Sequence, residues 1–278
     1  FKNPHSKVMT QSAIPFKENK HHCLELIGNK PPALFSDFDG TLSELNTDPR
    51  KAFIDPDCLS AIRRLRLTLP AIAIISGRMA TDVRNRVGLD KITYIGNHGA
   101  EQIEDGVLSR EPGALDDSDL ISTVLNYLKS RVNISGIFFE YKEISASIHY
   151  RCSRNRKSAY EELSVALREA PNIQNLDVFW GREILEIRPR TGFHKGYALR
   201  KLTEKYKIKS LVYVGDDTTD VDAFETLRTI RDEGEAIGIS AVVESKGMNK
   251  KLLETADIKI RGIEGMREFL SWLLSLSY

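Results

Sequence analysis

The chain is poor in cysteine, and the three cysteines that it has are far apart: Cys23, Cys58 and Cys152. A small disulfide-stabilised domain needs an even number of cysteines in a dense pattern. The odd count and the wide spacing argue against a disulfide framework. They favour reduced thiols, as in a cytosolic protein.

Net charge and long apolar runs are lacking too. The 40 Lys and Arg residues nearly balance the 39 Asp and Glu residues, which leaves a formal net charge of +1. No charge bias therefore favours nucleic acid or a membrane surface as a partner. No apolar stretch approaches the roughly 20 residues of a membrane-spanning helix, and no secretory signal is recognisable. We predict a cytoplasmic protein with neither kind of partner.

Asp37 and Asp39 are the most informative residues that the sequence does contain. They lie in the string SDFDGTL, residues 36–42, directly after the apolar run 32–35. Such a run is typical of a buried strand. Two carboxylates one residue apart at the end of a strand suit phosphoryl transfer, because one can attack phosphorus while the other handles the leaving group's proton. The alternative interpretation is an ordinary Asx turn.

Apolar runs and helical patterns alternate along most of the chain. The runs at 71–75, 92–95 and 211–214 predict strands covered on both faces, as in parallel sheets. The order of strands and helices favours an α/β fold with a doubly wound, Rossmann-like parallel sheet. The other predicted core elements are helices 56–69, 79–87, 195–206, 221–229, 249–255 and 263–276, and strands 236–243 and 257–260.

The pattern changes between residues 108 and 192. Predicted strands cluster there with two helices, which is typical of an α+β insert. These strands are 137–142, 144–151, 176–180 and 183–188. We therefore predict a core made of residues 31–107 and 193–278, an inserted α+β cap domain at 108–192, and a leader or short docking helix of unassigned role at 1–30.

Further acidic residues follow the strand predicted at 211–214: Asp216, Asp217 and Asp220. Ligands of open α/β sheets bind beyond the carboxyl ends of the strands, so these residues should meet Asp37 and Asp39. Hard oxygen ligands with few histidines nearby point to Mg²⁺ rather than zinc. The alternative for this second acidic cluster is a helix N-cap with acidic residues in the first turn, and both interpretations can hold.

Two more residues suit a phosphate group. Ser76 follows the strand predicted at 71–75 and opens a helix, where a hydroxyl and backbone N–H groups can bind an anion. Lys195 also opens a helix and can neutralise phosphate oxygens. The alternative for Lys195 is a solvated lysine.

Together these motifs resemble the haloacid dehalogenase superfamily of phosphotransferases. The resemblance rests on DFDGTL (37–42), SGR (76–78), KG (195–196) and GDDTTD (215–220). More narrowly, the chain resembles the trehalose-6-phosphate phosphatase family from about residue 33 to 262. The narrower resemblance rests on GNHGAE (96–101), FEYK (139–142), HYR (149–151), LEIRP (185–189) and GDDTTDVDAF (215–224).

The resemblance implies a phosphatase that needs Mg²⁺ and hydrolyses trehalose-6-phosphate to trehalose and phosphate through an aspartyl-phosphate. Asp37 would be the nucleophile and Asp39 the general acid/base. Ser76 and Lys195 would bind the phosphoryl group. The metal would be held by Asp37, the main-chain carbonyl of Asp39, and Asp216, with Asp217 or Asp220 assisting.

The chain departs slightly from the family pattern at two positions. Val221 stands where an acidic residue is frequent, and Ser36 precedes the nucleophile where an apolar or aromatic residue is common. Neither change removes a group that the chemistry needs, so the predicted activity is kept.

The predicted cap strands carry charged side chains on a shared face, because alternate residues of a strand point the same way. These are Glu140 and Lys142, then Ser147, His149 and Arg151, then Glu186 and Arg188. Such a face suits a sugar, whose hydroxyls can both donate and accept; the alternative is a solvated face with cross-strand ion pairs. With the resemblance, the predicted substrate-binding residues are Arg78, Asn97, His98, Glu101, Glu140, Lys142, Arg151 and Glu186.

The predicted partner is a small-molecule sugar phosphate, the predicted state is a monomer, and the resemblance raises association with a trehalose-phosphate synthase. Three rival functions stay open. One is a phosphatase for another phosphorylated glycoside, such as glucosyl- or mannosyl-glycerate phosphate or sucrose phosphate. The second is a hexose phosphomutase of the same superfamily, and the third is a catalytically silent regulatory domain attached to a glycosyltransferase.

Overall fold

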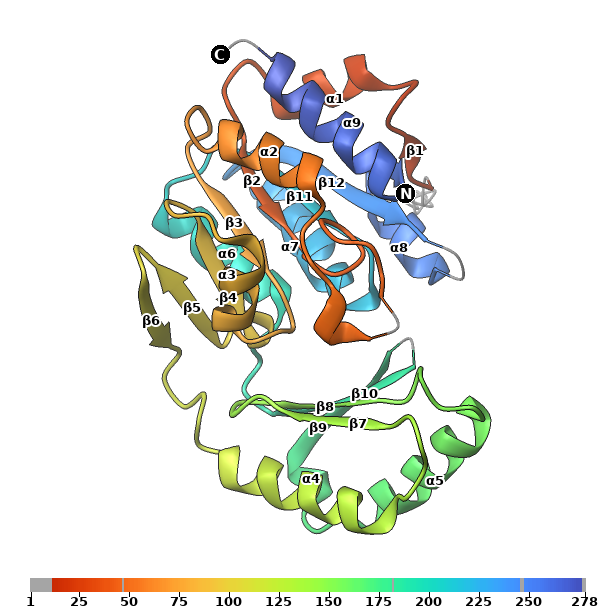
Figure 1. Ribbon diagram of the computed structural model, residues 1–278. Coiled ribbons are helices and arrows are strands. Elements are labelled where there is room, and N and C mark those ends of the chain that lie inside the picture. The colour runs from red at the N-terminus through yellow and green to blue at the C-terminus, as the bar shows by residue number, and fades with distance from the viewer. Residues whose placement is uncertain (1–11, 47, 182, 246–247, 277–278) are drawn as a thin grey trace, which may run out of the picture.

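The computed structural model describes residues 12–46, 48–181, 183–245 and 248–276. They form a large α/β core, in the upper part of Figure 1, and a smaller α+β cap, in the lower part. The cap is the segment from the start of α4 to the end of β10, and the other described residues form the core. This confirms the predicted α/β fold with an inserted α+β segment.

The core is built on a nine-stranded sheet in the order β1-β13-β12-β11-β2-β3-β4-β5-β6. The strands from β1 to β4 in this order are parallel, and β5 and β6 add an antiparallel hairpin at one edge. Every residue of β11 is buried, as expected for a strand covered on both faces. The bounds are β1 Ile14–Pro15, β2 Ala33–Ser36, β3 Ile72–Ile75, β4 Thr93–Gly96, β5 Glu101–Glu104, β6 Val107–Arg110, β11 Ser210–Gly215, β12 Ile237–Glu244 and β13 Ile258–Arg261.

Helices cover both faces of this sheet (Figure 1). Helices α1, α2, α3 and α9 pack on one face, and α6, α7 and α8 on the other. Among the described residues, no helix is both long and apolar enough to cross a membrane. The bounds are α1 Lys20–Ile27, α2 Pro56–Leu65, α3 Ala80–Val87, α6 Lys195–Lys205, α7 Val221–Asp232, α8 Lys250–Thr255 and α9 Gly262–Ser275.

Helix α2 shows how the local sequence determines where a helix begins. The Asp55 carboxylate accepts hydrogen bonds from the N–H groups of Asp57 and Cys58, and Pro56 takes the first helical position. Arg267 of α9 donates to the same carboxylate at 2.6 and 3.0 Å, so the cap of α2 also joins two helices. The helix ends at Leu65, four residues before the predicted end.

The segment predicted as a leader contributes to the core where the structure describes it. Strand β1 pairs with β13, and helix α1 buries Cys23 and Ile27 completely. The Phe16 ring packs at 4.9 Å from Phe269 and 5.3 Å from Trp272 of α9. The part of the prediction that concerns residues 1–11 lies outside the described residues.

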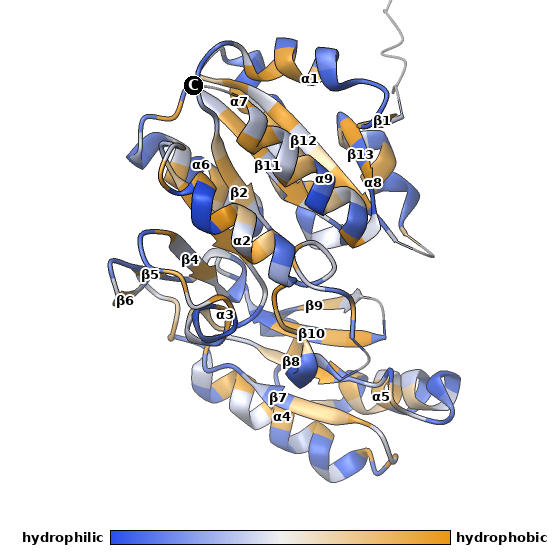
Figure 2. Cartoon of the chain, turned by 45° about the horizontal axis from the view of Figure 1, so that its top comes forward, coloured by the Kyte–Doolittle hydropathy of each residue, from blue (hydrophilic) through white to orange (hydrophobic). Residues whose placement is uncertain are grey.

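The cap is a four-stranded antiparallel sheet in the order β7-β8-β10-β9, with two helices on one face. Figure 2 shows hydrophobic and hydrophilic residues alternating along α4 and α5, as expected for helices with one buried face. The other face of the sheet looks toward the core. The bounds are α4 Ser118–Arg131, β7 Phe138–Tyr141, β8 Ala146–His149, α5 Arg156–Glu169, β9 Leu176–Gly181 and β10 Ile184–Pro189.

The β5–β6 hairpin places the end of the first core segment slightly later than the sequence pattern does. Strand β6 runs through the predicted boundary at 107 and continues the core sheet to Arg110. The chain then turns into α4 of the cap at Ser118, and it returns to the core with Lys195, the first residue of α6.

Candidate active site

The predicted strand-end residues meet at one edge of the core sheet. Asp37 follows β2, Ser76 follows β3 and Asp216 follows β11, and these three strands are parallel neighbours. A cavity of about 660 Å³ lies between this edge and the cap sheet, a size typical of small-molecule sites. Every predicted site residue lines it except Asn97, Glu101 and Asp220.

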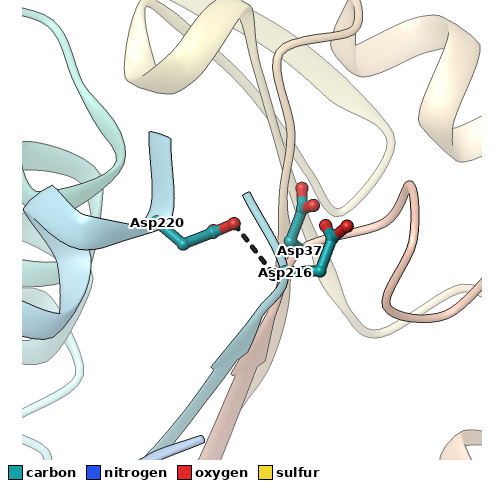
Figure 3. A group of neighbouring side chains, drawn as sticks. All are labelled: Asp37, Asp216 and Asp220. Carbon is teal, nitrogen blue, oxygen red and sulfur yellow. Dashed lines mark hydrogen bonds between the residues drawn. The ribbon is translucent and has the colours of Figure 1, made fainter. Parts of the chain in front are cut away.

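Asp37, Asp216 and Asp220 form an acidic cluster whose carboxylate oxygens lie within 4.8 Å of one another. Figure 3 shows Asp37 and Asp216 together at their strand ends, with Asp220 reaching them from the short helix η4 (Thr218–Asp220). All three are buried. Burial raises the pKa of Asp37 and of Asp216, and the neighbouring carboxylates raise them further. The cluster therefore favours a bound cation.

Lys195 supplies a positive charge inside this cluster. Its Nζ lies 2.9 Å from Asp37 Oδ1 and 2.8 Å from Asp220 Oδ1, and its side chain is 3% exposed. Burial alone would lower the pKa of Lys195, but Asp220 and Asp37 outweigh it and raise this pKa well above its usual range. The ammonium group therefore stays charged beside the predicted nucleophile.

Both carboxylate oxygens of Asp220 accept hydrogen bonds from the protein. Its Oδ1 accepts from the Tyr213 hydroxyl at 2.6 Å and from Lys195. Its Oδ2 accepts from the backbone N–H groups of Asp216 and Asp217 at 3.1 and 3.0 Å. Asp220 thus holds the turn after β11 and orients Lys195. The Asp217 carboxylate accepts from the N–H of Thr218 at 2.7 Å and faces the cavity.

Asp216 offers an open ligand. Its Oδ1 is buried and has no hydrogen-bond partner among the described residues. Gly40 makes room for this carboxylate: a Cβ at Gly40 would collide with it, and the φ of +79° also suits glycine. Oxygens of Asp37 and Asp216 are the donors that Mg²⁺ prefers, so the residues fit the predicted ion.

Arg78 is committed to protein partners although it lines the cavity. Its Nε and Nη2 donate to the two carboxylate oxygens of Asp39 at 2.6 and 2.7 Å. Its remaining donors reach Asp82 at 2.9 Å and the Pro49 carbonyl at 2.8 Å. Arg78 therefore holds Asp39 in a fixed orientation in this structure, rather than presenting a free guanidinium to a substrate.

Asn97 and Glu101 are not brought into the cavity. Glu101 is buried, and its Oε1 accepts from the Ala80 N–H at the start of α3 at 2.8 Å and from Asn97 at 3.1 Å. Burial raises the pKa of Glu101. Asn97 also accepts from Ser145 at 2.6 Å and donates to the Lys142 carbonyl at 3.3 Å. Asn97 thus joins the core to the turn between β7 and β8 of the cap, while Glu101 holds Asn97 and the start of α3 in place.

His98, Lys142 and Glu186 meet where the cap touches the core. His98 Nε2 lies 3.2 Å from Glu186 Oε2, and Lys142 donates to the Gly77 carbonyl at 2.8 Å. Burial, helped by Arg188, lowers the pKa of His98 to about 3, so its ring is neutral despite the nearby carboxylate. Burial alone would raise the pKa of Glu186, but Arg188, His98 and Lys142 hold it well below its usual range.

Two other predicted sugar contacts, Glu140 and Arg151, also line the cavity. Glu140 accepts from His149 at 3.0 Å. Burial alone would raise the pKa of Glu140, but His149 and Lys142 lower it to about 2, so it is ionised. Arg151 donates to the Asn46 carbonyl at 2.9 Å, which ties the cap to the loop after Asp39.

Several cavity residues were missed by sequence reasoning. Asn46 and Pro49 come from the loop after Asp39, where no periodic pattern marks a role. Phe179 of β9 also lines the cavity. Strand periodicity could have found it, since residues 177 and 179 share one face of the strand that was predicted at 176–180.

The doubly wound sheet, the acidic strand ends and the inserted cap define a protein of the haloacid dehalogenase class. The family model for trehalose-phosphatase matches residues 35–257. The chain belongs to the trehalose-phosphatase family.

Curated relatives and a solved structure agree with this assignment. The trehalose-phosphate phosphatase of Mycobacterium tuberculosis is 34% identical over 206 residues, covering 71% of this chain and 52% of the relative. The trehalose 6-phosphate phosphatase RA3 of Zea mays is 32% identical over 259 residues, covering 83% of this chain and 68% of the relative. The C-terminal domain of Candida albicans trehalose-6-phosphate phosphatase shares the fold, with a TM-score of 0.78 and 19% identity. The match covers 96% of this chain and 99% of that domain. The chain spans about half the length of the mycobacterial relative.

Proposed function

We propose that this chain is a phosphatase that hydrolyses trehalose-6-phosphate to trehalose and phosphate. The proposal rests on one observation: a single cavity has predicted phosphate-binding side chains on its core side and charged side chains on its cap side. Asp37 and Lys195 lie on its core side, while Glu140, Lys142 and Glu186 lie on its cap side. A phosphorylated sugar offers a phosphate to the first end and many hydroxyls to the second.

The core residues would carry out the phosphoryl transfer. Lys195 and the Ser76 hydroxyl donate to phosphoryl oxygens, and Asp37 attacks phosphorus to form an aspartyl-phosphate as the sugar oxygen leaves. Asp39 protonates that oxygen and then takes a proton from the water that hydrolyses the aspartyl-phosphate. Because Arg78 binds both oxygens of Asp39, at least one of these bonds has to open during the reaction.

Mg²⁺ held by Asp37 and Asp216 would offset the repulsion between the nucleophile and the phosphate. We therefore expect protein stripped by chelation and dialysis to release no phosphate from trehalose-6-phosphate, and added Mg²⁺ to restore the release. Ca²⁺ should inhibit, because its looser coordination favours both oxygens of one carboxylate. Protein dialysed without chelator is the control. Full activity in excess chelator would contradict the metal assignment.

A substrate panel tests the proposed activity itself. Release of inorganic phosphate with Mg²⁺ should be fastest for trehalose-6-phosphate, compared with sucrose phosphate, glucosyl-glycerate phosphate and mannosyl-glycerate phosphate. A hexose phosphomutase would interconvert hexose phosphates without releasing phosphate, and a silent regulatory domain would turn over none of them. The association with a trehalose-phosphate synthase and the monomeric state stay predictions.

Cap charges should set the choice of substrate. We expect Glu140→Gln and Glu186→Gln each to lower kcat/KM for trehalose-6-phosphate, equivalent to an activation free energy raised by roughly 2–4 kcal/mol. The reason is that a charged hydrogen bond to a hydroxyl is lost and the phosphate is less well aligned. Hydrolysis of p-nitrophenyl phosphate should hardly change, since this substrate is too short to need the cap. Steady-state kinetics on both substrates measures the difference.

Glu143→Gln is the matched control for this comparison. Glu143 belongs to the cap, is half exposed and pairs with Arg110, but it does not line the cavity. If Glu140→Gln and Glu186→Gln behave like Glu143→Gln on trehalose-6-phosphate, the charged cap face is only a solvated sheet face. The substrate assignment would then lose its physical support.

A further inference from the structure

Four side chains form a straight row across the cap sheet. The register pairs Glu140 with Ser147, Ser147 with Glu186, and Glu186 with Phe179. Directly paired residues in a sheet point to the same side, so Phe179 belongs to the charged face that lines the cavity. Neighbouring strands are about 4.8 Å apart, and the row therefore extends over roughly 14 Å.

Phe179 is the apolar end of this row. The residue is 45% exposed and lines the cavity. The Arg188 guanidinium lies against the ring, with Cζ 4.6 Å from the ring centroid. Arg188 is 9% exposed and is anchored by Glu186. The aromatic ring is thus supported from the protein side and keeps exposed surface toward the cavity.

Within the row, Glu186 is a residue that contacts the core, and Phe179 is its neighbour toward the edge of the cap sheet. Glu186 and Lys142 touch His98 and Gly77 of the core, next to Ser76. Phe179 lies one strand further out, on the edge strand β9. A substrate that extends from the phosphate site past Glu186 toward β9 would bring its far end to Phe179.

A glucose ring matches this combination of groups. Its hydroxyls project from the edge of the ring, where carboxylates such as Glu186 can accept from them. Its C–H bonds occupy the two faces, and the negative face of an aromatic ring attracts them. We propose that Phe179 is a stacking platform for the glucose ring that carries no phosphate, and that it selects a disaccharide phosphate over a monosaccharide phosphate. This inference rests on the proposed function.

Kinetics of Phe179→Ala and Phe179→Tyr test it. Phe179→Ala should raise KM for trehalose-6-phosphate roughly tenfold with kcat within about twofold, because an aromatic contact to the bound substrate is lost. Phe179→Tyr keeps the ring and should stay within about twofold of the wild type. The slower hydrolysis of glucose-6-phosphate should be the same in all three proteins, because this substrate has no second ring.

Phe53→Ala is the matched control. Phe53 is also an exposed phenylalanine beside an arginine, with Arg86 Cζ 5.5 Å from its ring, but it does not line the cavity. It should leave KM unchanged. Binding is measured independently in Phe179→Trp: trehalose should shift its fluorescence relative to the wild type, which reports the sugar at this position without turnover.

The outcomes separate this inference from the function on which it rests. If wild-type protein hydrolyses trehalose-6-phosphate but Phe179→Ala keeps the wild-type KM, the stacking contact is refuted and the phosphatase assignment stands. Equal losses on trehalose-6-phosphate and glucose-6-phosphate, in protein with a normal melting temperature, would also refute it. Failure of the wild type to hydrolyse trehalose-6-phosphate would overturn the proposed function, and the inference with it.

Discussion

Asp37→Asn should lower kcat for trehalose-6-phosphate by at least about a thousandfold, or roughly 4 kcal/mol in barrier height. An amide is a poor nucleophile and cannot form the acyl-phosphate. The fold should survive, because Asn is nearly isosteric with Asp and the change removes one of the crowded carboxylates around Asp216. Phosphate release, together with a thermal melt, measures both effects.

Asp90→Asn controls for a change of Asp to Asn away from the site. The Asp90 side chain is 88% exposed, and it is 3.8 Å from Arg84. This variant should keep wild-type kinetics and stability. If Asp37→Asn retained more than about a tenth of the wild-type rate, a change of only ~1.4 kcal/mol in barrier, covalent catalysis by Asp37 would be excluded.

The sequence predicts the core and the active-site edge well for a clear physical reason. A parallel strand covered on both faces has to be apolar along its length, as β11 is. Polar residues can resume only where the strand leaves the sheet, and parallel neighbours leave it at the same edge. Asp37, Ser76 and Asp216 could therefore be placed together before any contact was known.

What the sequence did not predict depends on contacts between distant residues. Residues 12–30 lack a convincing period, yet Phe16 and Ile27 become buried because α9 and β12 lie beside them. The bidentate pair of Arg78 with Asp39 joins residues 39 positions apart. Nothing in the local string around Arg78 distinguishes this partner from a bound substrate.

Within a motif, too, the sequence alone does not show which residue has which role. The string GDDTTD placed three carboxylates near the nucleophile, but it could not say which of them faces a metal. The structure separates them by their hydrogen bonds: Asp220 accepts from four protein donors, while Asp216 keeps one buried oxygen without a partner among the described residues. This division follows from the fold of the turn after β11.

Lys195→Met should have the largest effect on stability of any single change at the site. Removing the ammonium leaves Asp37 and Asp220 buried without their counter-charge. Breaking a buried ion pair from one side costs about 3–5 kcal/mol of unfolding free energy, equivalent to a fall in melting temperature of roughly 6–20 °C. Turnover should also be lost, because no ammonium remains to bind the phosphoryl oxygens. Urea unfolding and phosphate release measure the two losses.

The matched control and a double mutant show whether charge is the cause. Lys17→Met removes an exposed lysine, 72% accessible, that lies 3.4 Å from Glu268; an exposed ion pair contributes less than about 1 kcal/mol. In an Asp37→Asn background, Lys195→Met should cost roughly 1–3 kcal/mol less than in the wild type, because one of the two unpaired carboxylates is gone. Equal costs in both backgrounds would mean that Lys195 stabilises the core by packing alone. The predicted charge interaction between Lys195 and the nucleophile Asp37 would then be wrong.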